Sequence, residues 1–317
     1  MNLTGFHHLT AVTANAKANL AFYTQTLGLR LAKKTVNQDD TSAYHLFYAD
    51  GHGSPGTDIT FFDWPAARER RGSRSVVRTG FRVPSVNSLN YWAKRFDELK
   101  VDAKDIAERD GRPVLDFEDF EGQRLSLVVD NTAIEPWHAW EKSAVPAEHQ
   151  VRGLGAITMS VEDLAPTAKT LIGLMNMRHV REYETSGAPT HVYQMAPEGT
   201  ELGTHGELHV VVEPSAPRQF LGAGGVHHVA FRTPTLEQYL DWAARLEESD
   251  KRFSGPVDRF YFKSLYFREP SGVLFEIATD GPGFHSDEPM ESMGEKLALP
   301  PFLEPHRKDI EAGLKPL

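Results

Sequence analysis

The chain has no cysteine among its 317 residues. Disulfide bonds and thiolate metal ligands are therefore excluded. A metal site in this chain would have to be built from histidine and carboxylate side chains.

The chain also has fewer basic than acidic residues. The chain has 34 basic and 44 acidic residues, a formal net charge of −10, and no run of Lys and Arg that interleaves with aromatic residues. This balance argues against nucleic acid or an anionic membrane surface as a partner. The sequence also lacks a charged-then-apolar opening and any apolar stretch near the roughly 18 residues of a spanning helix. We expect a cytoplasmic protein whose partner is a small molecule, and homo-oligomer formation stays open.

Two histidine pairs, His7-His8 and His227-His228, lie in similar surroundings far apart in the chain. Each pair lies in a short apolar, β-branched run that predicts a strand, and each run is followed by apolar residues at helical spacing. The same unit therefore occurs twice. A chain of this length usually exceeds one hydrophobic core, which agrees with an organisation in repeated units.

Two further segments of the same design lie between the histidine pairs. The second unit opens at residues 80–83 and closes with the apolar run 125–129. The third opens at 156–161 and closes with 208–212. We interpret each of the four units as a strand, a helix and then several strands.

Proline-containing segments separate the units and suggest domain boundaries. We predict units one and two within residues 5–132, units three and four within 151–280, and a C-terminal tail at 281–317.

The four units can be aligned on one glycine ahead of each closing strand. These glycines are Gly56, Gly122, Gly206 and Gly272. The residues four positions later are Thr60, Ser126, Val210 and Glu276. The corresponding residues of the four opening strands are His8, Arg78, Ala156 and His228. Strong metal-ligand side chains therefore occur at aligned positions of units one and four.

This arrangement resembles the vicinal oxygen chelate superfamily, which includes glyoxalases, bleomycin resistance proteins and extradiol dioxygenases. The resemblance rests on the four units, the Leu-Gly-Leu of residues 27–29 and the Glu-Pro-Ser-Gly-Val-Leu-Phe-Glu of residues 269–276. It implies an α+β fold of four βαβββ modules, paired into two open barrels that curve into cups.

In that fold the eight aligned positions are where metal ligands arise, and here only His8, His228 and Glu276 carry strong ligand atoms. Two imidazoles and one carboxylate with open positions form the facial triad of non-haem Fe(II) oxygenases. Modules one and four must then share one metal cup. A single histidine on an apolar strand is more often a core residue than a ligand, but three ligand types at equivalent positions favour a metal. These side chains alone do not choose between iron, manganese and zinc.

Strand alternation makes a separate prediction for the other histidine of each pair. It places His8 and Thr10 on one face of the first strand and His7 on the opposite face, and it separates His228 from His227 in the same way. By this argument His7 and His227 are packing or surface residues.

A closer resemblance is to the hydroquinone ring-cleaving dioxygenases. It rests on the paired histidines, the aromatic stretch 258–267 and the Pro-rich tail 299–307. It implies Fe(II) as the cofactor, a small aromatic diol and O2 as substrates, and ring opening as the reaction. The residues that it implies are His8, His228 and Glu276 as iron ligands, Tyr266, Arg259 and His227 as catalytic groups, and His7 and Thr10 as substrate contacts.

Other interpretations stay open. Arg259 and Tyr266 can also be read as a surface arginine and a core tyrosine. A glyoxalase-type isomerase or lyase has the same fold, but it normally needs a second carboxylate or similar ligand where this chain has Thr60. A metal-free drug-binding protein of this fold has no need of the three ligands. Fold alone does not decide among these functions.

Overall fold

The computed structural model describes residues 1–132, 137–200 and 202–317. It confirms four βαβββ modules. The first contains β1 (Phe6–Thr13), α1 (Ala16–Ala21), a π-helical turn (Phe22–Thr26), β2 (Arg30–Asn37), β3 (Asp40–Ala49) and β4 (Asp58–Asp63). The second contains β5 (Ser75–Val83), α2 (Val86–Leu99), β6 (Ala107–Arg109), β7 (Arg112–Glu118) and β8 (Arg124–Val129). The third contains β9 (Leu154–Val161), α3 (Leu164–Lys169), a π-helical turn (Thr170–Leu174), β10 (Arg178–Thr185), β11 (Ala188–Gln194) and β12 (Glu207–Val212). The fourth contains β13 (Val226–Thr233), α4 (Leu236–Glu247), β14 (Val257–Asp258), β15 (Lys263–Arg268) and β16 (Leu274–Thr279).

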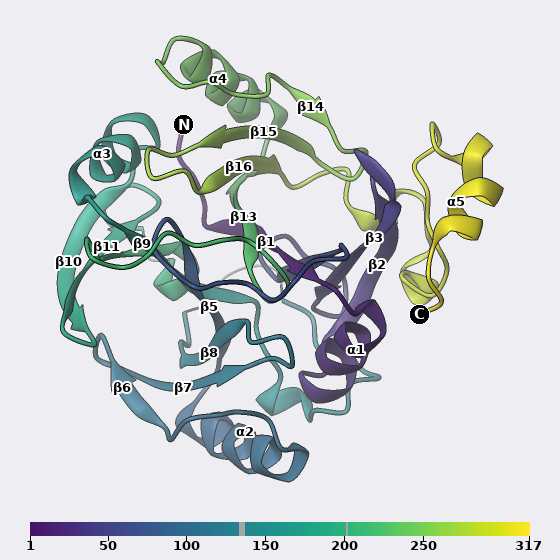
Figure 1. Cartoon of the computed structure of the whole chain (residues 1–317), viewed down its shortest axis with the longest axis horizontal. Helices are drawn as coiled ribbons and strands as arrows, with labels where there is room; N and C mark the ends of the chain where they lie inside the picture. The colour runs from purple at the N-terminus through teal and green to yellow at the C-terminus, as the bar shows by residue number, and fades with distance from the viewer. Residues whose placement is uncertain (133–136, 201) are drawn as a thin grey trace.

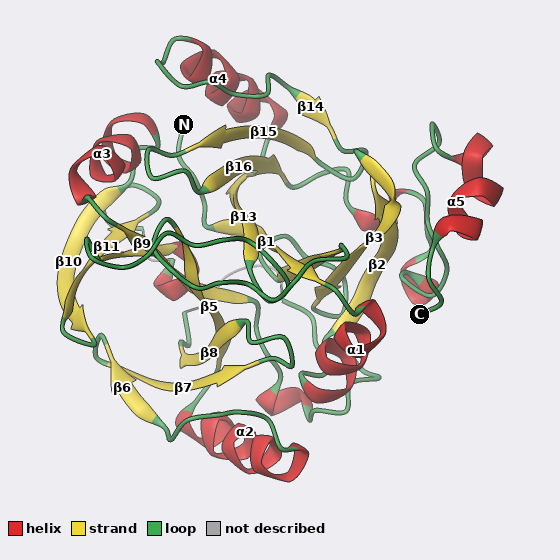
Figure 2. Ribbon diagram, viewed as in Figure 1, coloured by secondary structure: helices red, strands yellow, loops and turns green. Residues whose placement is uncertain are grey.

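The modules pair as the resemblance implies. Modules four and one form one sheet, with strand order β14-β15-β16-β13-β1-β4-β3-β2. Modules three and two form the other, with order β10-β11-β12-β9-β5-β8-β7-β6. Both sheets are strongly curled, and α1 to α4 lie around the outside (Figures 1 and 2). The shared cup of modules one and four is therefore confirmed as a feature of the fold.

Capping residues and apolar stripes explain where the two longer helices form. Ser85 and Thr235 precede α2 and α4, and each side chain accepts a hydrogen bond from a backbone N–H of the first helical turn. On their inner faces the helices carry Trp92 and Trp242, which are fully buried. These indole rings anchor the helices on the outer faces of the sheets and leave the concave faces free to form cups. No helix in the described parts of the chain is long and apolar enough to cross a membrane.

The central pair of the first sheet, β1 and β13, is antiparallel and carries an irregularity at each histidine pair. Phe6 lies opposite Phe231 but His8 lies opposite Ala230, so β1 has one extra residue, His7. At the other end of the pairing, the register shifts by one residue in β13 between the partners of Thr10 and Ala11. The extra residue there is His227. Each strand thus contains a β-bulge at the first histidine of its pair, and bulges of this kind re-aim side chains.

The C-terminal tail packs along the edge of the first sheet. The Ala298 N–H donates to the Lys34 carbonyl of β2 at 2.9 Å, and the buried Lys33 ammonium donates to Asp287 at 2.7 Å. Ile310, in α5 (Arg307–Gly313), clusters with Val36 of β2. In Figure 1 this yellow segment lies beside β2 and β3. The tail therefore covers an otherwise open sheet edge, which would be prone to pairing with another chain.

A buried histidine, His205, joins the two halves of the molecule. It lies in a short 3-10 turn of module three and packs against Gly5 and Gly56 of the first sheet, where an added Cβ would come within 2.1 and 2.6 Å of its ring. Its Nδ1–H donates to the Leu154 carbonyl at 3.3 Å. Burial lowers the pKa of His205 from 6.5 to about 3. The folded protein therefore holds this imidazole neutral.

This lowered pKa predicts a pH dependence of stability. Between pH 6.5 and 3 the unfolded chain binds a proton at position 205 and the folded chain does not, so stability falls as pH falls. We expect wild type to lose about 1–2 kcal/mol more unfolding free energy between pH 7 and pH 5 than His205→Asn, because an asparagine does not titrate. Urea unfolding at both pH values measures the difference. Parallel pH dependences of the two proteins would refute a neutral buried His205.

Candidate metal and substrate site

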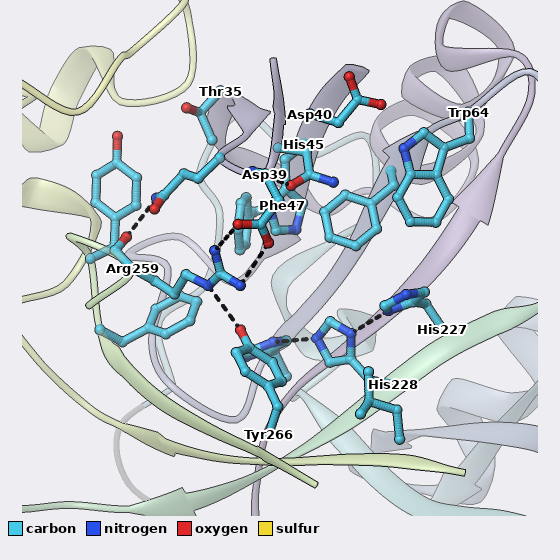
Figure 3. Close-up of a pocket in the computed structure, with 17 residues that line it drawn as sticks. Thr35, Asp39, Asp40, His45, Phe47, Trp64, His227, His228, Arg259 and Tyr266 are labelled. Atoms are coloured by element: carbon cyan, nitrogen blue, oxygen red, sulfur yellow. Dashed lines mark hydrogen bonds and ion pairs between the residues drawn. The ribbon is translucent and has the colours of Figure 1, made fainter. Parts of the chain in front are cut away.

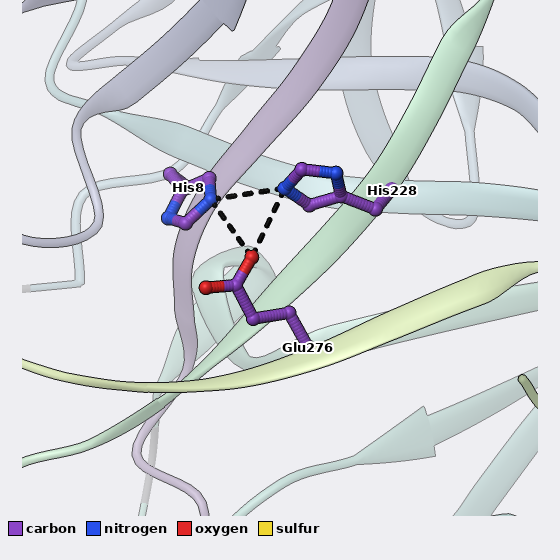
Figure 4. A group of neighbouring side chains, drawn as sticks. All are labelled: His8, His228 and Glu276. Carbon is purple, nitrogen blue, oxygen red and sulfur yellow. Dashed lines mark hydrogen bonds and ion pairs between the residues drawn. The ribbon is translucent and has the colours of Figure 1, made fainter. Parts of the chain in front are cut away.

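His8, His228 and Glu276 meet at the centre of the first sheet (Figure 4). They lie on the adjacent strands β1, β13 and β16, and their exposed fractions are 1%, 4% and 0%. The two Nε2 atoms are 3.2 Å apart, and Glu276 Oε2 lies 3.2 Å from His8 Nε2 and 3.0 Å from His228 Nε2. The structure thus brings together the three residues that the sequence nominates as metal ligands.

These distances fit a shared metal ion. Ligand atoms held about 2.0–2.2 Å from one ion and at right angles to one another are separated by about 3 Å. Glu276 Oε2 is buried without a hydrogen bond of acceptable geometry among the described residues, although it faces two imidazole nitrogens. Its Oε1 atom accepts the hydroxyl of Ser264. Burial opposes ionisation, but the facing His8 and His228 outweigh it and hold the pKa of Glu276 well below its usual value. The donor set and its geometry suit a divalent cation.

Strand alternation breaks down at His7 and His227, because both are the extra residues of the two bulges, although neither belongs to the group of candidate ligands. Instead of pointing away, His7 Nδ1 lies 2.8 Å from His8 Nδ1, and His227 Nδ1 lies 2.7 Å from His228 Nδ1. Burial, followed by the neighbouring histidine, lowers the pKa of each outer imidazole to about 3. Both are therefore neutral and can accept a hydrogen bond.

Metal binding at Nε2 would fix the tautomer of the inner histidines. If Nε2 of His8 binds a metal, its proton is on Nδ1 and is donated to His7. The same argument links His228 to His227. Metal-binding histidines commonly donate their second N–H to a partner that orients the ring and raises its basicity. With a metal bound, each histidine pair would combine a ligand and its hydrogen-bond partner in adjacent residues.

A cavity of about 360 Å³ is lined by His8 and His228, two of the three candidate ligands (Figure 3). Six of the side chains that line it are Phe, Tyr or Trp: Phe47, Phe62, Trp64, Tyr261, Phe262 and Tyr266. The polar lining includes His8, Asp39, His45, His227, His228, Arg259 and Tyr266. A cavity that combines aromatic side chains with polar groups on more than one wall suits a small planar ligand with polar substituents. His7 and Thr10 are buried outside this lining, so direct substrate contact by these two remains a prediction.

Arg259 and Tyr266 belong to the cavity wall. Tyr266 lies opposite Glu276 in the register of β15 and β16, and its ring meets that of His228 edge-on at 5.9 Å. The Arg259 Nε–H donates to the Tyr266 hydroxyl at 3.2 Å, and its other nitrogens donate to both oxygens of Asp39 at 2.9 and 3.1 Å. Burial, followed by the charge of Glu276, raises the pKa of Tyr266. The phenol is therefore protonated and close to the metal ligands.

Asp39 and His45 are cavity residues that the sequence reasoning missed. Asp39 lies in the turn between β2 and β3 and reaches across to Arg259 of module four. His45 lies on β3, with Nε2 2.9 Å from the Thr60 hydroxyl, and that hydroxyl lies 2.8 Å from the Thr10 hydroxyl. The sequence showed only that both residues belong to module one. Their place in the cavity depends on the register of β2 and β3 against β4, which is set by tertiary pairing.

Two further groups of potential metal ligands occur among the described residues. Asp110, Glu207 and His209 lie in the cup of the second sheet, where Arg112 and Arg181 donate to Glu207 at 3.0 and 2.8 Å. These arginines already neutralise the carboxylates. The other group, at positions 179, 182 and 191, lies on the surface strands β10 and β11. Among these three groups of described residues, His8, His228 and Glu276 therefore form the one that is fully buried and whose carboxylate is not paired with an arginine.

Comparison with known proteins agrees with this architecture. The sequence model of the Glyoxalase/Bleomycin resistance protein/Dioxygenase superfamily matches residues 5–127 and 153–277. A provisionally named ring-cleaving dioxygenase of Bacillus subtilis, MhqA, is 42% identical over 318 residues and covers 100% of both chains. The chlorohydroquinone/hydroquinone 1,2-dioxygenase of Sphingobium indicum is 28% identical over 316 residues, 95% of this chain and 92% of that one.

Solved structures give the same result for the fold. A provisionally described dioxygenase from Bacillus subtilis superposes with a TM-score of 0.89 at 36% identity, covering 99% of this chain and 97% of the other. Glyoxalase I from Zea mays superposes with a TM-score of 0.63 over 87% of this chain and 92% of its own, and at 12% identity this likeness concerns the fold alone. The chain belongs to the glyoxalase, bleomycin resistance protein and dioxygenase superfamily.

Proposed function

We propose that the protein is an Fe(II)-dependent ring-cleaving dioxygenase that opens a hydroquinone-type ring with O2. The observation that carries this proposal is the buried group of His8, His228 and Glu276, which faces an aromatic-walled cavity of about 360 Å³. The names of the relatives that align over most of both chains support it. Two imidazoles and a carboxylate that leave positions open suit non-haem iron that must accept both substrates.

The reaction balances without another reductant. One ring carbon–carbon bond breaks beside a hydroxyl-bearing carbon, and both atoms of O2 enter the product, an unsaturated acid with an aldehyde end. When bound to these ligands, Fe(II) supplies a Lewis acid for the phenol oxygen and the redox chemistry that O2 requires.

The protein's own groups bind and orient the ring. Phe62 and Trp64 stack with centroids 4.8 Å apart and form one apolar wall, so a flat ring can lie against them without trapped water. Tyr266, held by Arg259, presents a protonated hydroxyl beside the ligands and can donate to a ring oxygen there. His227 lines the cavity, and because its Nδ1 would accept from His228, its Nε2 would carry the proton and can donate a hydrogen bond to a substrate oxygen.

The isomerase alternative has less support from the site. Thr60 stands where a glyoxalase-type enzyme places a further ligand, and its hydroxyl is already within hydrogen-bond distance of Thr10 and His45. A metal-free binding protein gives no reason to bury an ionised Glu276 between two imidazoles, which is costly without a cation.

The first test of the site is metal binding. We expect His8→Ala, His228→Ala and Glu276→Ala each to lose Fe(II), because a three-ligand site has no ligand to spare. Metal analysis after anaerobic reconstitution and gel filtration measures the bound iron. His209→Asn, in the second cup, is the control and should keep the ion. Full occupancy in any ligand variant would rule out the triad.

The second test concerns the groups beside the ligands. Tyr266→Phe and Arg259→Met should keep iron but lower kcat about 10²–10⁴-fold, the usual contribution of a positioned proton donor or its partner. Arg245→Met is the control, because Arg245 is an arginine of the same module but lies on α4 and donates to the exposed Gly173 carbonyl. Wild-type kcat/KM in both site variants would make these residues structural.

The third test identifies the reaction class. Oxygen uptake by the iron-loaded enzyme should occur with hydroquinones and be weaker with catechols, and no turnover of the methylglyoxal–glutathione adduct is expected without O2. Uptake with catechol and none with any hydroquinone would instead indicate ordinary extradiol chemistry. Conversion of the adduct in the absence of O2 would establish the isomerase.

A further inference from the structure

We propose that His45 holds the ring hydroxyl that lies para to the metal-bound oxygen, and that this contact selects para-diols over ortho-diols. The inference rests on the proposed function and names a specificity-determining residue for it.

His45 lies on the wall of the cup at a distance from the ligands. The strand order β1-β4-β3 puts it two strands from His8, with Phe62 of β4 as its direct partner. Two strand spacings separate the strands of His45 and His8 by roughly 10 Å, and because Phe62 pairs with Val12 of β1, His45 is also displaced four residues, roughly 13 Å, along the strand direction. His45, His8 and His228 all line the same cavity. A flat ring in that cavity can therefore reach the ligands with one edge and His45 with the other.

The imidazole of His45 is held in place on three sides. Its centroid lies 4.0 Å from that of Phe47 and 4.4 Å from that of Phe62. Its Nε2 is 2.9 Å from the Thr60 hydroxyl, which is itself anchored 2.8 Å from the hydroxyl of Thr10. A ring fixed in this way loses little conformational entropy when it binds a ligand.

The second nitrogen of His45 is available to a ligand. Nδ1 makes no hydrogen bond to the described residues, and it is not among their fully buried unpaired atoms, so it is reached from the cavity. Burial, followed by the nearby His8 and His228, lowers the pKa of His45 well below its usual value. A neutral imidazole with Nε2 committed to Thr60 can exchange a hydrogen bond with a phenol at Nδ1.

The geometry of the substrate explains why this contact discriminates. A para-diol that binds the metal through one oxygen carries its second hydroxyl at the opposite end of the ring, towards His45. An ortho-diol keeps both oxygens at the metal end and turns a C–H towards Nδ1. A site built to hydrogen-bond a hydroxyl disfavours the analogue that lacks it there, because its polar group loses water without gaining a partner.

Arg259 and Tyr266 do not make this distinction. Tyr266 lies opposite Glu276 in register, and Arg259 is bonded to Tyr266, so this pair acts at the metal end. Both kinds of diol present an oxygen there. The hydroxyl that distinguishes a para-diol from an ortho-diol is therefore recognised at the opposite wall of the cavity, where His45 lies.

The experiment compares kcat/KM for hydroquinone and for catechol in the same iron-loaded preparation. His45→Leu should lower the hydroquinone-to-catechol ratio about tenfold or more, mainly through a higher KM for hydroquinone. His45→Gln, whose amide can still bond a hydroxyl, should restore part of the ratio. The control is His191→Leu, on β11 of the other sheet, which should leave the ratio unchanged. A general loss of folding or iron lowers both activities together and leaves the ratio as it was.

A second variant tests the same contact in case His45→Leu does not fold. Thr60→Val removes the hydroxyl that holds Nε2 and keeps the side-chain volume, so the ratio should move in the same direction by less. An unchanged ratio in the variant that folds overturns the role of His45. If wild type opens catechol and no hydroquinone, or neither diol, the proposed function fails and the inference with it. If wild type opens hydroquinone but the hydroquinone-to-catechol ratio is unchanged in both His45→Leu and Thr60→Val, the inference about His45 fails and the proposed function stands.

Discussion

The antiparallel pairing of β1 with β13 is the contact on which the site depends. It joins modules one and four into one sheet and places His8 beside His228, although the two are far apart in the chain. The parallel neighbour β16 then brings Glu276 to the same point. Because each strand of the central pair has a bulge at its first histidine, both histidines of a pair are used. One ring of each pair faces Glu276, and the other contacts it through Nδ1.

The second sheet has the same architecture but lacks the His, His and Glu side chains at the equivalent positions. Its central pair, β5 with β9, is also antiparallel and carries register shifts at the corresponding place. Its cup is filled by ion pairs: Arg181 and Arg112 neutralise Glu207, and Arg78 lies 2.9 Å from Asp116. Buried carboxylates with these partners are satisfied without a metal. Modules of the same architecture thus form one cup with an accessible cavity and one whose carboxylates are paired with arginines.

Much of this structure could be predicted from the sequence, because the repeat made equivalent positions comparable. The four repeated units followed from aligned residues, whereas the pairing of the first with the fourth and the meeting of His8, His228 and Glu276 followed from those residues together with the resemblance to a known fold. The position of His7 did not, since strand alternation assumes an unbroken ladder and a bulge shifts the phase by one residue. His45 was missed because its place on the cup depends on the register of β3 against β4. The clamp of the tail on β2 depends equally on tertiary contacts, such as that between Lys33 and Asp287.

The most direct test of this account is where a metal binds. Anomalous diffraction from crystals grown anaerobically with Fe(II) would locate the ion without reference to activity. We predict one strong peak within coordination distance of His8 Nε2, His228 Nε2 and Glu276 Oε2, on the side that faces the aromatic cavity. A peak among Asp110, Glu207 and His209 instead, with none at the first cup, would contradict the central claim.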